Sequence, residues 1–169
     1  SEPYPSKAEM EIIYQAALRA PDHAWQRPSR FIQVTGKGLE KLSSIFVDFA
    51  KENIEGVSDE TLQKYKDAPF RAPMIIILVS EIKIHPKVPE IEQILSAGAA
   101  AQNILIASHS LGYTAIWRTG FLAFNEEVSI SFGLDKSDII IGYLYIGSTD
   151  KKLEAPEVSN FNDFVYKWS

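Results

Sequence analysis

Apolar positions along the chain switch repeatedly between a helical period of three to four residues and the period of two that is typical of strands. Boundary signals accompany the helical runs, such as the capping-box spacing of Ser6 and Glu9 and the Ala20-Pro21 pair that ends the first run. We predict helices over residues 7–19, 39–49, 58–66, 90–111 and from the Asn125 cap to about 133. We predict strands over residues 31–35, 74–80, 113–117 and 139–147. Residues 36–38 are expected to form a turn and 82–89 a loop.

Two of these elements are apolar nearly throughout. Residues 74–80 are a continuous run rich in β-branched side chains, which is typical of a strand covered on both faces. The stretch from Ser96 to Gly120 begins as a helix without a polar face and carries small residues from Ala97 to Ala101. We expect this helix to lie at the centre of the protein, with its glycine and alanine surface in contact with another subunit.

Helices and strands alternate along the whole chain, which favours an α/β or α+β sandwich and leaves open whether the strands pair parallel or antiparallel. With 169 residues and 46% hydrophobic content, residues 1–169 are expected to form one domain with a substantial core. The tail from about 149 to 169 is polar apart from Phe161, Phe164, Tyr166 and Trp168. We expect it to pack on its own domain or on a second subunit.

Composition and charge narrow the class of function. The net charge is -5 and no run of Lys or Arg stands out, which argues against nucleic acid or an anionic membrane as the main partner. The apolar runs are too short to span a bilayer. Without cysteine there is no disulfide, thiolate metal site or cysteine nucleophile, and the chain fits a reducing compartment such as the cytoplasm. The scattered residues His23, His85 and His109 give no metal-ligand spacing.

Two short polar motifs follow apolar elements and are candidates for binding. Arg19 and His23 come where the first helix ends. They could contact an anion or a ring nitrogen, or they could be helix-end residues favoured by the macrodipole, with Asp22 in a cap or salt bridge. Arg118 and Thr119 could bind a phosphate or a heteroaromatic oxygen, or Arg118 could pair with a carboxylate such as that of Asp22. The residues alone leave both questions open.

Other motifs argue against common enzyme classes. Neither a Gly-x-Gly-x-x-Gly fingerprint nor a phosphate-binding P-loop is present, so a Rossmann or nucleotide-hydrolase function is not supported. No pair of acidic residues is singled out by its spacing for glycosidase chemistry. We interpret Arg71, which precedes Ala72-Pro73, and His109, near the end of the long helix, as structural residues.

Several short motifs nevertheless follow one another in a characteristic order along nearly the whole chain. They are Leu18-Arg19-Ala20-Pro21-Asp22-His23, Ala68-Pro69-Phe70-Arg71-Ala72-Pro73, Lys87-Val88-Pro89, Ser96-Ala97-Gly98, Ala101-Gln102-Asn103-Ile104-Leu105, Leu111-Gly112-Tyr113, Ile116-Trp117-Arg118-Thr119-Gly120 and Gly142-Tyr143-Leu144-Tyr145-Ile146-Gly147. In this order they resemble the FMN-dependent NAD(P)H nitroreductase family, and within it the short, YdjA-like branch. The set is far more specific than any single motif in it.

The resemblance implies an α+β sandwich with a mostly antiparallel central sheet flanked by helices, in a homodimer with two FMN sites at the subunit interface. NADH or NADPH would reduce the flavin, and a nitroaromatic, quinone or similar acceptor would then take the electrons in a ping-pong cycle, so no side chain need be catalytic. By position in the motifs, the expected FMN contacts are Arg19, His23, Trp117, Arg118 and Thr119. The nicotinamide nucleotide would lie near Ala107, Ser108, His109, Ser110, Leu111 and Gly112.

Three positions depart from the pattern of the family. The family normally carries Arg-Arg-Ser, which grips the FMN phosphate, just before the position of Ser1, and we expect the natural protein to have such a segment. Arg27-Pro28-Ser29 stands where Gln-Pro-Trp is common, and Ala24 stands where close relatives often have a lysine. The alternatives are a flavin-binding or interaction protein without turnover, and a flavin enzyme with another acceptor such as an enone.

Overall fold

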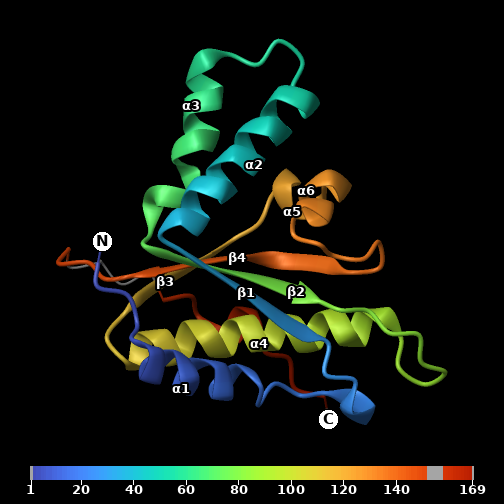
Figure 1. Ribbon diagram of the computed structural model, residues 1–169. Helices are drawn as coiled ribbons and strands as arrows, with labels where there is room; N and C mark the ends of the chain where they lie inside the picture. The colour runs from blue at the N-terminus through green and yellow to red at the C-terminus, as the bar shows by residue number, and fades with distance from the viewer. Residues whose placement is uncertain (1, 152–157, 169) are drawn as a thin grey trace.

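Four antiparallel strands form the centre of the computed structural model, which describes residues 2–151 and 158–168 (Figure 1). They are β1 (Ser29–Thr35), β2 (Met74–Ser80), β3 (Thr114–Arg118) and β4 (Ile139–Gly147), in the order β1-β2-β4-β3. One face is covered by α1 (Lys7–Ala17) and α4 (Glu90–Ser110). On the other face lie α2 (Lys37–Asn53), α3 (Asp59–Asp67), α5 (Phe121–Phe124) and α6 (Glu126–Ser131). The α+β prediction is confirmed, and the strand pairing that the residues alone left open is antiparallel.

Strand β2 is buried along its whole length, as its apolar run predicts. Because successive side chains of a strand point to opposite faces, Ile75, Ile77 and Val79 join the core under α2. Met74, Ile76 and Leu78 join the second core, under α1 and α4. The sheet therefore separates two hydrophobic cores, one on each of its faces.

Sequence signals locate most helix ends. The predicted capping box of α1 is present: the Ser6 amide donates to the Glu9 carboxylate at 2.8 Å, and the Ser6 hydroxyl accepts from the Glu9 amide. Ser58 and Asn125 cap α3 and α6 in the same way. The predicted glycine turn is shorter than expected, because Gly38 lies inside α2. Three 3-10 turns, His23–Trp25, Ala68–Arg71 and Phe161–Asp163, fall outside the predicted elements.

Helix α4 is not buried on all sides. Ala97, Ala100 and Ala101 are buried within their own chain, so the expectation that they contact another subunit is wrong, whereas Gly98 and Ala99 are partly exposed and for them it stays a prediction. Three apolar side chains on the opposite side of the helix are more than half exposed: Ile91, Leu95 and Ile106. We call these three residues the α4 strip. No helix in the described ranges is long and apolar enough to cross a membrane.

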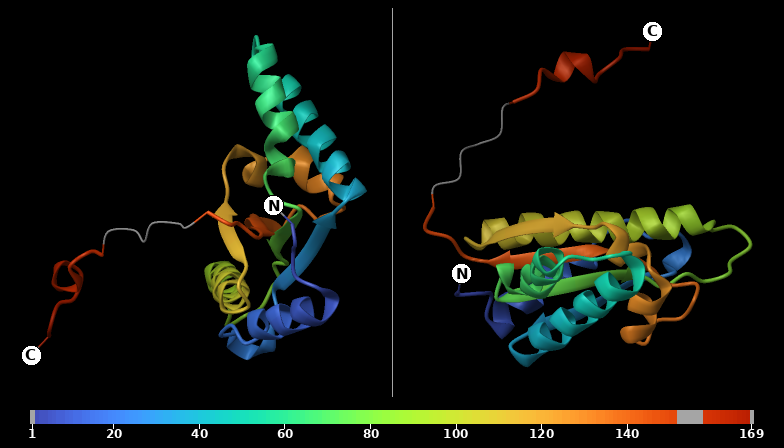
Figure 2. Two further views of the ribbon diagram at one scale, coloured as in Figure 1. Left: turned by 90° about the vertical axis from the view of Figure 1, so that its left-hand side faces the viewer. Right: turned by 90° about the horizontal axis from the view of Figure 1, so that it is seen from above.

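The described part of the tail, residues 158–168, extends away from the rest of the chain (Figure 2). All of its residues are exposed, including Phe161, Phe164, Tyr166 and Trp168. Packing on its own domain is therefore wrong for these residues, which leaves a second subunit as the expected site of packing. Ser1, residues 152–157 and Ser169 lie outside the described residues.

Trp117 fills a slot between α4 and β4. Its indole N–H donates to the carbonyl oxygen of Ile141 at 3.2 Å. Two glycines, Gly98 and Gly142, border the ring, and the space available for an added Cβ atom differs greatly between them. A Cβ atom on Gly142 would lie 2.8 Å from the carbonyl oxygen of Arg118 and closer still to the Trp117 ring, whereas one on Gly98 would lie 3.9 Å from that ring.

These clearances give opposite expectations for two alanine substitutions. We expect Gly142→Ala to lower the free energy of unfolding by about 1–3 kcal/mol, because backbone and indole must both shift. Gly98→Ala should leave it unchanged or raise it by about 0.5–1 kcal/mol, because alanine favours the interior of a helix over glycine. Urea unfolding of both variants checks this pair, and equal losses would contradict it.

Candidate functional site

Three of the five predicted FMN contacts, Arg19, Arg118 and Thr119, line cavities in the described part of the chain, and they do so in two separate places, whereas His23 and Trp117 line none of these cavities. Arg19, just beyond α1, lines a cavity of about 530 Å³, which we call the Arg19 cavity. Arg118 and Thr119 line a cavity of about 370 Å³ under α2 and α3, and Arg118 also lines one of about 270 Å³. We call these two the Arg118 cavities, and they share no lining residue with the Arg19 cavity. Trp117 packs in the core on the α4 side, so the structure separates it from its neighbour Arg118.

The loop over residues 22–28 borders the Arg19 cavity and has an unusual backbone. Ala24, Trp25 and Arg27 have φ angles of 54°, 55° and 49°, in the left-handed region that side chains with a Cβ rarely adopt. Each such residue costs on the order of 1–3 kcal/mol and persists only where its surroundings hold it. Part of that support is local, because the Asp22 carboxylate accepts the Arg27 amide at 2.8 Å.

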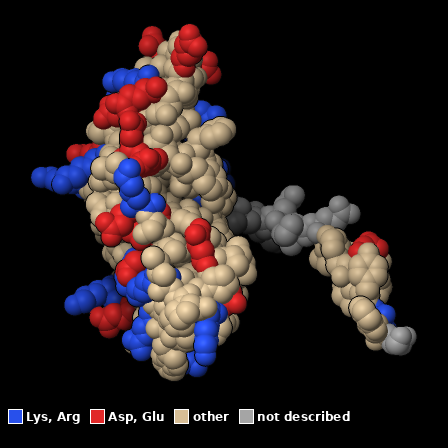
Figure 3. Space-filling model, turned by 90° about the vertical axis from the view of Figure 1, so that its right-hand side faces the viewer, with Lys and Arg blue, Asp and Glu red and all other residues tan. Residues whose placement is uncertain are grey.

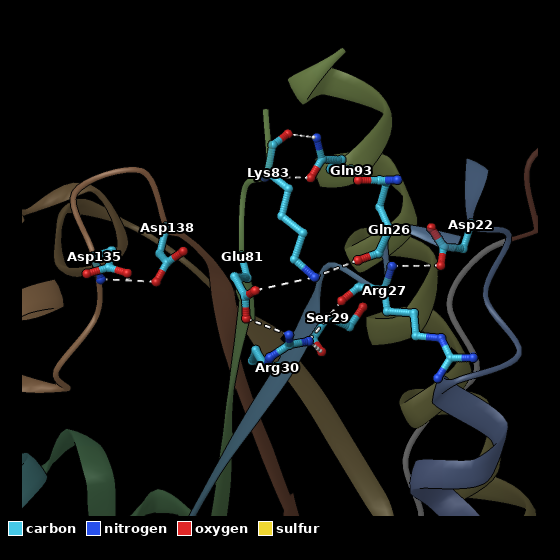
Figure 4. Close-up of polar contacts among 10 residues, drawn as sticks. All are labelled: Asp22, Gln26, Arg27, Ser29, Arg30, Glu81, Lys83, Gln93, Asp135 and Asp138. Carbon is cyan, nitrogen blue, oxygen red and sulfur yellow. Dashed lines mark hydrogen bonds and ion pairs between the residues drawn. The ribbon is translucent and has the colours of Figure 1, made fainter. Parts of the chain in front are cut away.

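The same loop is also fixed by ionic and polar contacts from Arg30 in β1 and from Glu81 and Lys83, which follow β2 (Figure 4). The Lys83 ammonium donates to the carbonyl oxygen of Gln26 at 2.8 Å, and the Arg30 guanidinium donates to that of Arg27 at 2.8 Å. The Glu81 carboxylate pairs with both cations. We call Arg30, Glu81 and Lys83 the loop clamp. It holds two consecutive carbonyl groups and so determines where the side chains of the loop point.

His23 connects this loop to α4. Its Nδ1 atom lies 2.6 Å from Oε2 of Glu92, and both side chains are partly exposed. Asp22 binds the loop backbone instead of pairing with a cation. Of the two interpretations of the Arg19–His23 motif, the structural one therefore holds for Asp22 and His23, which contact other parts of the protein. Arg19 makes no ion pair in the described ranges and faces the cavity.

Arg118 is exposed and does not pair with Asp22, which lines the other cavity. Arg71 lines both Arg118 cavities beside it. Burial raises the pKa of the Tyr145 hydroxyl, and the positive charges of Arg71 and Arg118 oppose that rise. Arg71, interpreted from the sequence as structural, is thus part of a two-arginine surface. Only the strand order, which brings the start of β2 near β3 across β4, could have revealed this.

The segment predicted to lie near the nicotinamide nucleotide, Ala107 to Gly112, forms the C-terminal end of α4 and the two residues after it. Ser108 is fully buried, and its hydroxyl has no hydrogen-bond partner in the part of the chain that the structure describes. Its carbonyl oxygen accepts the amide of Tyr113 at 2.9 Å. His109, Ser110 and Gly112 are exposed, but no residue from Ala107 to Gly112 lines the three cavities. The nucleotide contact therefore stays a prediction.

Neither the distribution of surface charge nor the arrangement of metal-ligating side chains indicates a further site. Acidic and basic side chains are interspersed on the face shown in Figure 3. Among the described residues, no group of three or more His, Asp or Glu side chains is placed to hold a metal ion. The chemistry available at the cavities is therefore that of guanidinium groups, hydroxyls and aromatic rings.

Comparisons with known proteins show the family and the fold of the chain. The model of the nitroreductase family matches residues 1–148. The protein named "Putative NAD(P)H nitroreductase YdjA" from Escherichia coli (strain K12) is 36% identical over 152 residues, which cover 90% of this chain and 82% of that protein.

Solved structures show the same fold at lower identity. A nitroreductase-like family protein from Bacillus cereus has a TM-score of 0.84 at 20% identity, covering 99% of this chain and 88% of its own. The FMN- and NADPH-dependent nitroreductase NfnB from Sphigopyxis sp. strain HMH has a TM-score of 0.75 at 18% identity, covering 100% and 92%.

The two-arginine surface can be tested through Tyr145. Replacing Arg71 and Arg118 together with glutamine should raise the pKa of the Tyr145 hydroxyl further, because the phenolate loses two nearby positive charges. Alkaline absorbance titration measures the tyrosinate, and the difference from Tyr145→Phe identifies the contribution of this residue. An unchanged Tyr145 titration in the double variant would contradict the arrangement.

Proposed function

The chain belongs to the nitroreductase family, and from this premise we propose that it is an FMN-dependent oxidoreductase that passes electrons from NADH or NADPH to a small aromatic acceptor. Nitroaromatics and quinones are the acceptor classes we expect. The observation that carries the proposal is the pair of cationic surfaces, Arg19 with its loop and Arg71 with Arg118, each within a motif that the family model covers. The names of YdjA and NfnB support the nicotinamide donor, and that of NfnB supports FMN.

The residues at the cavities fit FMN. The Arg19 cavity, at about 530 Å³, has the size of a small-molecule site, for which ~300–1,000 Å³ is usual. Arginine N–H groups match a phosphate or the carbonyl oxygens of a flavin, and the Thr119 hydroxyl adds a neutral donor. When bound, FMN supplies the electron-carrying ring, and the protein supplies position and electrostatics. We expect Arg118 to lie beside the phosphate or the pyrimidine side of that ring, where its charge favours the negative charge that reduction adds.

We further propose that a complete site needs two copies of the chain. Arg19 and His23 of one protomer would face the same FMN as Arg118 and Thr119 of its partner, because within one chain Arg19 lines a different cavity from Arg118 and Thr119. The exposed α4 strip and the exposed aromatic side chains of residues 158–168 support a homodimer, since apolar groups in such number are typical of an interface. The absence of cysteine fits work in the cytoplasm.

The central test is flavin uptake. We expect purified protein incubated with FMN to retain flavin absorbance after unbound FMN is removed. Arg118→Ala should weaken FMN affinity about tenfold, the lower end of what a charged hydrogen bond contributes, because the side chain is exposed. Lys136→Ala removes a cation from the exposed pair with Glu126 and serves as the matched control.

Three results bear on the alternatives. Absence of flavin bands before and after incubation would overturn the enzyme proposal. Bound flavin without NAD(P)H oxidation in the presence of any acceptor in a panel of nitroaromatics, quinones and enones would favour a binding protein. Intersecting double-reciprocal lines in steady-state assays would contradict ping-pong transfer, which gives parallel lines.

The dimer is tested by mass. We expect light scattering to give twice the chain mass of 18.9 kDa, and we expect either Ile106→Asp or a chain ending at Lys151 to shift the equilibrium toward monomer. Ile130→Asp is the matched control, because Ile130 is 58% exposed on α6 and Ile106 is 56% exposed on α4. A monomer at every concentration, or equal effects of the two aspartates, would contradict the proposed interface.

A further inference from the structure

Arg27 differs in its ion pairing from Arg30, Lys83 and His23, the other cations that contact its loop or belong to it. Arg30 and Lys83 share Glu81, and His23 meets Glu92. Arg27 has no ion pair within the described ranges. The nearby carboxylate of Asp22 accepts the Arg27 backbone amide, and Figure 4 shows the guanidinium directed away from it, toward the end of α1.

The backbone around Arg27 is fixed at three atoms. Its amide donates to Asp22, its carbonyl accepts from Arg30, and the preceding carbonyl accepts from Lys83. With φ at 49°, this backbone presents the exposed side chain of Arg27 at the Arg19 cavity, which it lines. The guanidinium carbon lies 5.5 Å from the ring centre of Trp25, which holds the group without consuming its N–H donors. The charge is therefore positioned and still available to a ligand.

The lining of this cavity is cationic overall. Arg19 and Arg27 both line it without a paired carboxylate in the described ranges, whereas the charge of Arg30 is balanced by Glu81. Asp22 is the one acidic residue among the lining residues of this cavity. A guanidinium edge presents two parallel N–H groups that match a carboxylate, sulfonate or phosphate, and the 76% exposed Trp25 ring offers a flat surface for an aromatic ligand.

We propose that Arg27 binds an anionic group on the electron acceptor, so that this enzyme prefers acidic aromatic acceptors to neutral ones of the same shape. The inference rests on the proposed function. The glutamine that the family commonly has at this place carries no charge and would lack this preference. The phosphate of FMN shares the chemistry of such an acceptor, so the experiment must separate the two sources.

The probes are 4-nitrobenzoate and 4-nitrobenzamide, which differ in charge and little in shape. With FMN-loaded protein, the expected result is a lower KM for 4-nitrobenzoate. Arg27→Gln should raise that KM about tenfold, as expected for the loss of a charged hydrogen bond, with kcat and the KM for 4-nitrobenzamide little changed. Arg27→Lys keeps the charge and should recover part of the preference, while Lys136→Gln should resemble the original protein.

Binding without turnover gives an independent measurement. Titration calorimetry with benzoate and benzamide, which lack the reducible nitro group, should show the same selective loss in Arg27→Gln. Fluorescence titrations with FMN and riboflavin test the other source, because only FMN has a phosphate. We expect Arg27→Gln to leave the ratio of their affinities unchanged. Equal unfolding midpoints confirm that the variants remain folded.

Each result that differs from these expectations would lead to a different conclusion about Arg27 or the proposed function. Equal losses for the acid and the amide would overturn the proposal, since charge would then not be what Arg27 recognises. A loss of affinity for FMN and not for riboflavin, with the acceptor preference intact, would assign Arg27 to the cofactor phosphate and also overturn it. Failure of every variant to take up flavin would refute the proposed function instead, and benzoate selectivity in the flavin-free protein would still decide the role of Arg27.

Discussion

Burial of β2 on both faces is the constraint on which the rest of the molecule depends. Its seven side chains are fully removed from water, and the large aliphatic ones each contribute about 1.5–3 kcal/mol. A strand of this kind needs a neighbour on each edge and a helical layer on each face. The chain supplies them with β1 and β4, and with α1 and α4 opposite α2. Charged groups are excluded from the two resulting cores, and both cationic surfaces lie where strands or helices end.

Much of this fold follows from the sequence because its signals are local. The bounds predicted for β2 and β4 match the structure to the residue, since long β-branched runs are bounded by polar or glycine residues. Capping residues such as Ser6 and Asn125 locate helix starts for the same reason. The four-residue α5 was missed because it is too short to show a period. The exposure of Ile91 was missed because hydrophobicity along the sequence does not show which face of a helix the rest of the chain covers.

The candidate site was less predictable, because it depends on which distant segments meet. Motif order identified Arg19 and Arg118 individually, but their separation into different cavities follows from the three-dimensional fold. Arg71 looked structural until the antiparallel order brought the start of β2 near Arg118. The loop clamp could not be predicted either, because Lys83 lies more than fifty residues from Gln26, whose carbonyl group it holds, and Glu81 lies more than fifty residues from its ion-pair partner Arg30.

The loop clamp has an evolutionary consequence. The clamp acts on carbonyl groups, which every amino acid possesses, so the direction of the side chain at position 27 does not depend on which side chain is there. Residues that tolerate φ near 49° can be exchanged at this position without dismantling the contacts that hold the loop. Ligand preference can then diverge between relatives by single substitutions while the scaffold stays the same. This separation between framework and recognition lets one architecture serve many different small molecules.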